Sequence, residues 1–255
     1  MNKLILLTFA GLLATHAGHA QEFKTKLSGK DRKIVIDMQG SDVTVEGIDG
    51  DELQIRGNGY EEPSKRAEGL HPIYNSAVDN TKIGLSVTQQ DNTVRIVRAS
   101  RRDASYTIRV PRNSAVRYSQ SGWSSGDVVM RDIAGDLEVS LKSGDMKLTN
   151  VAGPLVANSI SGDITVRFAT LRQGPSAIST VSGDVDVSLP ASTKATLKLR
   201  SISGEVYTDF DINLGKGEDN LRHIGGQVVD GSINGGGNAM SLKTVSGDIY
   251  VRKAK

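Results

Sequence analysis

The sequence predicts an all-β protein whose chain winds as a β-solenoid, a single-stranded β-helix or β-roll with coils of 18 to 22 residues. Three observations lead to this fold class. A Ser-Gly-Asp tripeptide recurs at nearly constant spacing, apolar residues two positions apart follow it, and no stretch beyond the first twenty residues has an apolar stripe at helical spacing. A period of this length is too short for a strand–helix–strand crossover, and it fits coils that stack on one another.

Residues 1–20 are predicted to be a secretory signal peptide. Met1-Asn2-Lys3 is cationic, the run from Leu4 to Ala14 is mainly apolar, and Gly18 and Ala20 are the small residues that a signal peptidase reads. The apolar run is shorter than the roughly 20 residues that cross a bilayer. We therefore expect an exported protein that begins at Gln21 and has no membrane anchor. Where the host has two membranes we expect the periplasm, with secretion or surface association as alternatives.

Residues 22–124 are predicted to form less regular β coils. Gly residues separate the first three strands, and residues 60–81 lack periodicity and are expected to form a loop. The six predicted strands of this part are Lys33–Asp37, Val43–Val45, Leu53–Ile55, Gly84–Val87, Val94–Val97 and Tyr106–Val110.

Residues 125–255 are predicted to contain seven repeats. Ser-Gly-Asp, or Ser-Gly-Glu, begins at Ser125, Ser143, Ser161, Ser182, Ser203 and Ser246. The last interval is twice as long as the others, and aligning Ile224–Val228 with Ile202–Val206 places a seventh, degenerate copy within it. Glycine takes positive φ without steric cost, so it is expected where the chain reverses. The predicted turn glycines are Gly126, Gly144, Gly162, Gly183, Gly204, Gly226 and Gly247. We expect residues 21–255 to form a single domain.

Two segments carry a resemblance to a known family. Tyr106–Pro111 leads to Ser125-Gly126-Asp127, and a closing run extends from Gly235 through Ile249. In order and spacing these segments and the internal copies resemble the bacterial "putative adhesin" β-strand-repeat domains, a family of unknown function, over about residues 30–255. The resemblance implies a β-helix or β-roll in an exported protein, and it implies no catalytic residues.

Composition restricts the classes of function. The chain has 31 Lys and Arg against 29 Asp and Glu, and one Lys lies in the predicted signal peptide, so residues 21–255 carry a net charge of +1. This balance argues against nucleic acid as a partner. With no cysteine, disulfides, thiolate catalysis, Cys-ligated zinc and a lipid-modified Cys are excluded. The low aromatic content of 4% makes a sugar-cleaving or nucleic-acid-reading site less expected.

An acidic or amide side chain follows each turn glycine. These residues are Asp127, Asp145, Asp163, Asp184, Glu205, Gln227 and Asp248. A calcium ladder is one interpretation, but calcium takes about 6 to 8 oxygen ligands and one carboxylate per coil supplies too few. We favour the interpretation that these side chains accept backbone N–H groups inside the turns. We therefore predict no metal site and no cofactor.

Other candidate catalytic residues are sparse. Only His71 and His223 follow the predicted signal peptide, and no nucleophile motif accompanies them, so both are interpreted as loop or turn residues. Gly235-Gly236-Gly237 lacks the Lys-Ser/Thr of a phosphate-binding loop and is interpreted as a tight turn. We predict no catalytic residues.

Two features are candidates for binding. Trp123, the only tryptophan, either stacks on a sugar or covers the first regular coil, and coverage is favoured. Residues 95–117 contain seven arginines against Asp103 alone, which is either a solvated face or a patch for phosphate or carboxylate groups. The candidate patch consists of Arg95, Arg98, Arg101, Arg102, Arg109, Arg112 and Arg117.

Two hypotheses of function follow. The first is a non-enzymatic, adhesin-like binding or scaffold module of the cell envelope, whose partner is an envelope polymer or envelope protein. The alternative is a carbohydrate-active enzyme on a β-helix, because paired carboxylates across a solenoid groove can cleave polysaccharide. A cluster of two or three carboxylates in an open groove beside exposed aromatics would favour the enzyme, whereas a featureless groove with the arginines on one flank would favour the binding module.

Overall fold

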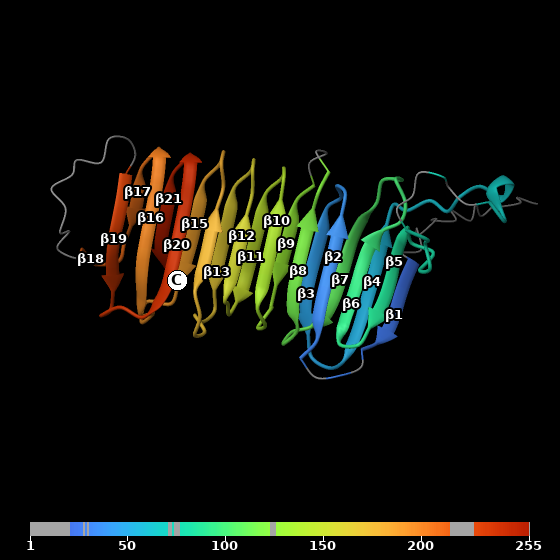
Figure 1. The fold of residues 1–255 in the computed structure, drawn as a ribbon, viewed down its shortest axis with the longest axis horizontal. Coiled ribbons are helices and arrows are strands. Elements are labelled where there is room, and N and C mark those ends of the chain that lie inside the picture. Colours follow the sequence, from blue (N-terminus) through green and yellow to red (C-terminus); the bar gives the residue numbers. More distant parts are fainter. Residues whose placement is uncertain are drawn as a thin grey trace, which may run out of the picture.

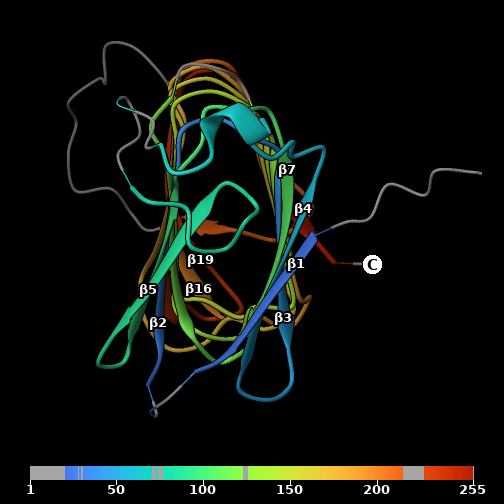
Figure 2. The same cartoon turned by 90° about the vertical axis from the view of Figure 1, so that its right-hand side faces the viewer.

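Two long β-sheets face each other and run the length of the molecule (Figure 1). The computed structural model describes residues 21–27, 29, 31–70, 73, 77–122, 126–214 and 227–254. Its strands lie across the long axis, and the view along that axis shows a flattened tube with one sheet on each broad side (Figure 2). The predicted all-β solenoid is confirmed.

Sheet A has ten strands and sheet B has eleven. In spatial order, sheet A consists of β1 (Gln21–Lys26), β4 (Glu52–Asn58), β7 (Ser105–Pro111), β3 (Val43–Ile48), β9 (Val128–Arg131), β11 (Met146–Val151), β13 (Ile164–Phe168), β15 (Val185–Leu189), β21 (Ile249–Lys253) and β17 (Val206–Thr208). Sheet B consists of β18 (Asn213–Leu214), β19 (Gln227–Ile233), β16 (Ala195–Ser203), β20 (Asn238–Ser246), β14 (Ser176–Ser179), β12 (Leu155–Asn158), β10 (Leu137–Leu141), β8 (Ala115–Gln120), β2 (Lys33–Met38), β6 (Thr93–Arg98) and β5 (Leu85–Gln90). One short 3₁₀ helix, η1 (Lys65–Ala67), lies within the predicted loop.

Each regular coil contains one strand of sheet B, a glycine turn and one strand of sheet A. Strands of neighbouring coils pair in parallel and in register, so that Ile164 of β13 lies beside Met146 of β11 and Val185 of β15. Alternate side chains point inward, and the inner residues of β13, Ile164 and Val166, are fully buried. The core is therefore a continuous apolar layer between the two sheets. The six strands predicted before residue 124 are all present.

The turn glycines form a column in which backbones lie very close together. Gly183 has a φ of +134°, and a Cβ placed on it would lie 2.3 Å from the carbonyl oxygen of Gly162 in the preceding coil. Gly126 is a different case, since its φ is not positive, yet a Cβ there would lie 2.5 Å from the oxygen of Ser41. Close stacking, and not only positive φ, explains why the repeat keeps glycine.

Buried hydroxyl groups satisfy the carbonyl groups of these turns. Two residues before the Ser of each later turn, a Ser or Thr points inward where other inner positions are apolar. Thr180 Oγ1 donates to the oxygen of Gly162 (3.2 Å), Thr244 Oγ1 to that of Gly183 (3.0 Å) and Ser201 Oγ to that of Gly247 (2.9 Å). These polar groups are buried but paired, which removes the cost of leaving them unsatisfied.

The last coil of the chain does not stack at the end of the solenoid. β20 pairs in parallel with both β14 and β16, and β21 pairs with both β15 and β17, so this coil lies between two coils that precede it in sequence. In Figure 1 the red strands β20 and β21 accordingly lie among orange ones. Sequence order and spatial order therefore differ here.

The seventh predicted repeat is wrong. Gly226 itself lies outside the described residues, but β19, which begins at Gln227, lies in sheet B and pairs antiparallel with β16. The strands that follow the true turns lie in sheet A and pair in parallel. The long interval between Ser203 and Ser246 thus contains the antiparallel strands β18 and β19, which extend the end of sheet B.

The other end of the solenoid has the same interleaved arrangement. The coil of β2 and β3 lies between the coil of β6 and β7 and the coil of β8 and β9, although it precedes both in sequence. Antiparallel strands complete this end, with β4 and β1 beyond β7 in sheet A and β5 beyond β6 in sheet B. The coil of β2 and β3 at this end and the coil of β20 and β21 at the other are thus both flanked on each side by other strands.

Candidate functional site

The structure divides the seven arginines of the predicted patch between two sheets and the turns. Arg95 and Arg117 flank Val35 on the outer face of sheet B, where Arg95 Nη1 lies 2.6 Å from Asp37 Oδ2 and Arg117 Nε lies 3.4 Å from Glu138 Oε1. Arg109 lies on the outer face of sheet A. The chain passes from one sheet to the other between β6 and β7, which separates residues that are close in sequence.

The remaining four arginines lie near the ends of strands. Arg112 Nε is 2.9 Å from Asp49 Oδ1, and Arg102 Nη1 is 3.8 Å from Glu61 Oε2; Arg101 follows β6. Arg98 is 7% exposed, and its guanidinium donates to the carbonyl oxygens of Gly40, Ser100 and Arg102. Arg98 is therefore buried and joins segments of the chain through these hydrogen bonds, so it is not a surface ligand for polymers. The seven arginines do not converge on one surface, which corrects the candidate patch.

The aspartates after the turn glycines form a hydrogen-bonded ladder. Asp145 Oδ1 accepts the N–H of Asp163 at 2.9 Å, and the same contact joins every neighbouring pair along the stack at 2.7 to 3.0 Å. The carboxylates do accept backbone N–H groups, as predicted, but each accepts from the next coil and not from its own turn. The ladder begins at Asp42, in a Gly40-Ser41-Asp42 turn that the repeat pattern misses, and ends at the N–H of Glu205 on the edge coil.

Several predicted residues cannot be placed. Trp123, His71 and His223, like residues 1–20, lie outside the described residues. Gly235 and Gly236 have φ values of +85° and +80° between β19 and β20, which confirms the tight turn. Within the described ranges, no three His, Cys, Asp or Glu side chains lie together in a way that could hold a metal ion. In the same part of the chain, no helix has the length and apolar character needed to span a membrane.

A row of cations that was not predicted crosses the outer face of sheet A. Its positions are in register from strand to strand, and a basic side chain occurs on every second strand of nine. We call the five residues Lys24, Arg109, Arg131, Arg167 and Arg252 the basic row. Two strand intervals correspond to about 9.6 Å, so the row presents charges at a regular spacing.

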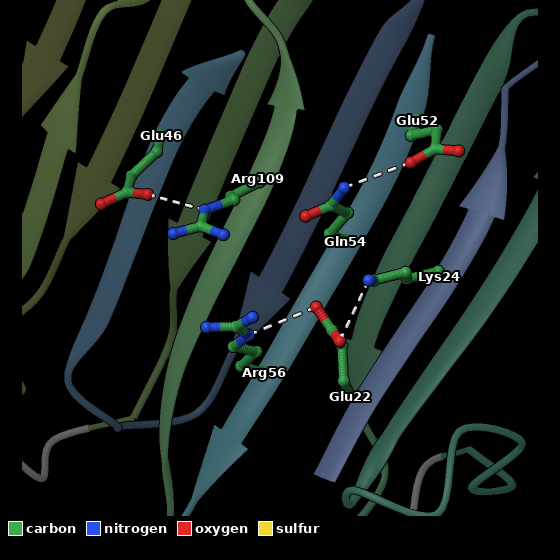
Figure 3. A network of polar contacts seen from close by, with 7 residues as sticks. All are labelled: Glu22, Lys24, Glu46, Glu52, Gln54, Arg56 and Arg109. Atoms are coloured by element: carbon green, nitrogen blue, oxygen red, sulfur yellow. Dashed lines mark hydrogen bonds and ion pairs between the residues drawn. The ribbon is translucent and has the colours of Figure 1, made fainter. Parts of the chain in front are cut away.

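Most members of the basic row have carboxylate partners. Arg109 Nε lies 2.9 Å from Glu46 Oε2, and Arg131 Nε lies 3.8 Å from Glu46 Oε1. Lys24 contacts Glu22, whose pKa is lowered chiefly by this hydrogen bond (Figure 3). For Arg167 no carboxylate within ion-pair distance occurs among the described residues. Exposed pairs of this kind contribute only about 0 to 1 kcal/mol, so they leave the cations available to a polyanion.

Two tyrosines and an arginine stack where the basic row reaches β21. The rings of Tyr207 and Tyr250 are nearly parallel, at 12°, with centroids 5.2 Å apart. Arg252 Cζ lies 4.8 Å from the centroid of Tyr250, and Arg252 Nε contacts Asp186 at 3.0 Å. The Tyr250 hydroxyl donates to Asp248 Oδ2 at 3.0 Å, and this hydrogen bond is the main cause that raises the pKa of Tyr250. The Tyr250 ring is thus held in place by its contacts with Tyr207, Arg252 and Asp248.

These side chains line a groove of about 520 Å³ on the outer face of sheet A. Arg167, Ser188, Asp209 and Lys253 complete its wall. Asp209 Oδ1 accepts the backbone N–H of Lys253 at 2.8 Å, and Asp186 nearby is bound to Arg252. The groove therefore combines aromatic rings with cations, while its carboxylates are engaged in structural contacts.

The sequence contained a signal for this stack. Tyr207 and Tyr250 occupy the same position of the repeat, three residues after the turn glycine. Side chains at one repeat position stack only if their coils are neighbours, and the misplaced seventh copy between them hid that adjacency. Three members of the basic row, Arg131, Arg167 and Arg252, likewise share one repeat position, five residues after the turn glycine. Lys24 and Arg109 lie outside the repeats, and only the strand register aligns them with the other three.

Comparisons with known proteins place this geometry in a family. The chain is similar to solved structures of low identity: a "putative cell adhesion protein" from Clostridium sporogenes (10% identity, 92% of this chain, 100% of that chain, TM-score 0.48) and a "putative adhesin" from Bacteroides fragilis (15%, 91%, 96%, 0.34). A third, from Parabacteroides distasonis, is called a "putative lipid binding protein" (11%, 94%, 98%, 0.37).

No curated protein matches the chain. The family model that does match covers residues 124–252, just over half of the chain, from the turn before β9 into β21. The expected adhesin-like repeat family of unknown function is thereby confirmed, and the chain belongs to the Toastrack DUF4097 family.

Proposed function

We propose that this protein is a non-enzymatic binding module of the cell envelope and that the outer face of sheet A binds an anionic envelope polymer. The observation that carries this proposal is the basic row, in which cations repeat on every second strand of a rigid sheet. Guanidinium groups pair with carboxylate and phosphate groups in bidentate geometry. A periodic row of such groups suits a long, repetitive ligand better than a small molecule.

The groove favours binding over catalysis. Glycoside hydrolysis needs two carboxyl groups that are free to act on the glycosidic bond. Asp209 is the carboxylate that lines the groove, and its Oδ1 accepts the Lys253 N–H. Asp186, bound to Arg252, lies beside the groove and does not line it. Action in the envelope follows from the signal-peptide pattern of residues 1–20.

The proposal is tested by binding of poly-glutamate and of lipopolysaccharide to the mature chain. The triple variant Arg109→Ser, Arg131→Ser, Arg167→Ser should weaken binding strongly. A matched triple variant on sheet B, Arg95→Ser, Arg117→Ser, Arg200→Ser, removes the same charge from the opposite face and should bind like the parent. Binding should weaken with salt, because the Debye length falls from about 10 Å at 0.1 M to about 3 Å at 1 M.

Two results would overturn the proposal. If the two triple variants lose binding equally, only net charge matters and sheet A has no special role. If neither polymer binds the parent at low salt, the basic row is a solvated face. Shortening of an acidic polysaccharide during incubation would instead favour the enzyme hypothesis.

A further inference from the structure

The stack of Arg252, Tyr250 and Tyr207 ends in an open aromatic face. β21 lies between β15 and β17, and Asp186 of β15 draws Arg252 to the side away from Tyr207. Tyr207 belongs to β17, the last strand of sheet A, and it is 49% exposed. Within the described part of the chain no further strand of sheet A covers the outer side of this ring. A large aromatic ring is thus held rigidly with one face free, which suits a flat apolar ligand surface.

The groove extends from this ring to two cations of the basic row. Arg167 and Arg252 are both members of the basic row and both line the groove, together with the hydroxyl groups of Ser188 and Thr208. The apolar face of a sugar ring stacks on tyrosine, its hydroxyl groups bond to serine and threonine, and an acid group on the sugar pairs with arginine. The three kinds of contact occur together here.

The spacing of the basic row gives the charge density of the ligand. Cations separated by two strand intervals are about 9.6 Å apart. This is close to the length of one disaccharide in an extended linear polysaccharide. A nucleic acid carries a phosphate about every 3.4 Å along each strand of a duplex, so its charges are much denser than the row. The row therefore matches a glycan with one acid group per disaccharide.

We propose that the groove is the terminal subsite for a linear acidic polysaccharide that lies along the basic row, with its terminal sugar ring on Tyr207 and the acid groups of the following disaccharides at Arg252 and Arg167. This inference rests on the proposed function and adds the class of ligand. The solenoid axis and the polysaccharide axis are then parallel, and each second coil contacts one disaccharide. Tyr207 discriminates between a glycan and a polyanion that lacks sugar rings.

The experiment compares two probes by isothermal titration calorimetry: a hyaluronate oligosaccharide, which has one carboxylate per disaccharide, and poly-glutamate of similar length. The parent should bind hyaluronate more tightly. Tyr207→Ala should weaken hyaluronate binding by about fivefold to tenfold, as expected for one lost stacking contact, and should leave poly-glutamate binding unchanged. Tyr207→Phe keeps the ring and should bind like the parent. Equal melting temperatures of the three proteins verify that β17 stays folded.

Each outcome has a distinct meaning. If the parent binds both probes equally, or if Tyr207→Ala weakens both equally, the sugar subsite is refuted while the proposed binding of anionic polymers stands. If the parent binds neither probe, the proposed function fails as well. A preference for hyaluronate that disappears only in Tyr207→Ala supports the subsite.

Discussion

At the scale of single residues, the turns depend on two different requirements that coincide at one position. The glycine must adopt positive φ, and it must also let the backbone of the next coil approach. The aspartate that follows supplies the acceptor for the next coil's N–H, which replaces repulsion between stacked carboxylates with a bond from each to its neighbour. The Ser-Gly-Asp tripeptide therefore specifies both the turn and the contact with the neighbouring coil.

The glycine requirement can be separated into its two parts. Gly183→Ala should lower the free energy of unfolding by more than about 2 kcal/mol, because strain at φ +134° adds to a clash with the Gly162 oxygen. Gly235→Ala is the matched control: its φ is +85°, but nothing lies within 4 Å, so only the strain of about 1 kcal/mol applies. Asp184→Asn keeps the acceptor oxygen and should cost less than either. Urea denaturation measures all three, and equal losses for the two glycine variants would contradict the close-approach argument.

A buried tyrosine predicts how stability changes at alkaline pH. Tyr106 is 2% exposed and donates a hydrogen bond to the Ile83 oxygen at 3.0 Å. Burial raises the pKa of Tyr106 from 10.0 to about 12. The folded state therefore holds this proton more tightly than the unfolded state, so its contribution to stability is complete below pH 10 and is lost as pH rises toward 12.

The same dependence should be smaller in Tyr106→Phe, which has no hydroxyl to ionise. Unfolding free energies measured across this pH window give the comparison. Burial also raises the pKa of Tyr118, so some alkaline loss should remain in the variant. Identical pH profiles for parent and variant would show that Tyr106 ionises freely in the folded state.

How much of the site can be predicted from the sequence depends on whether residues that are close in space also lie in consecutive repeats. The role of Asp163 was predictable because the repeat places Asp145 and Asp184 beside it. The burial of Arg98 was not, since its partner Gly40 is 58 residues away on a coil that is inserted from earlier in the chain. The pair of Tyr207 and Tyr250 lies between these cases: the repeat position was readable, but the order of the coils was not.

At the scale of elements, the coils differ in how strongly their removal should destabilise the fold. The coils from β9 to β15 stack in sequence order. Each of these coils therefore ends beside the start of the next one, as the pairing of Ser143 with Ser161 indicates. The coil of β20 and β21 instead fills a space between β14–β15 and β16–β17. The loop before β16 is held by Asn234, whose Nδ2 donates to the oxygens of Ala191 and Thr193 at 3.0 and 2.7 Å. These hydrogen bonds tie the turn between β19 and β20 to the loop before β16.

Two deletions of equal length test this difference. Removal of residues 143–160 takes out one internal coil and should leave a cooperatively folded, all-β protein, because Lys142 can join directly to Ser161. Removal of residues 238–255 takes out the inserted coil, leaves unpaired edges on both sides of the space, and should cause a much lower melting temperature and aggregation. Circular dichroism and light scattering measure both properties. Similar melting temperatures would mean that the neighbouring coils close the space by themselves.

At the scale of the whole molecule, the fold class was predictable and the order of the coils was not. The all-β solenoid follows from alternation and a constant period, which are local properties of the sequence. The order depends on which coil stacks on which. Because the coils have similar apolar inner faces, the repeat sequence does not specify which coil lies next to which. Antiparallel strands occupy three of the four outermost positions of the two sheets, and they lie in the segments where the repeat pattern is weakest.

The insertion of the coil of β20 and β21 leaves the stack open until these two strands are in place. While the protein is being made, β14 and β15 lack their partners β20 and β21 until β16 to β19 have been made. A product that stops early, even after most of the coils are present, retains two open sheet edges in its middle. Such edges recruit other chains and admit proteases. The topology thus makes closure of the stack depend on β20 and β21, which follow in sequence both of the coils that they join.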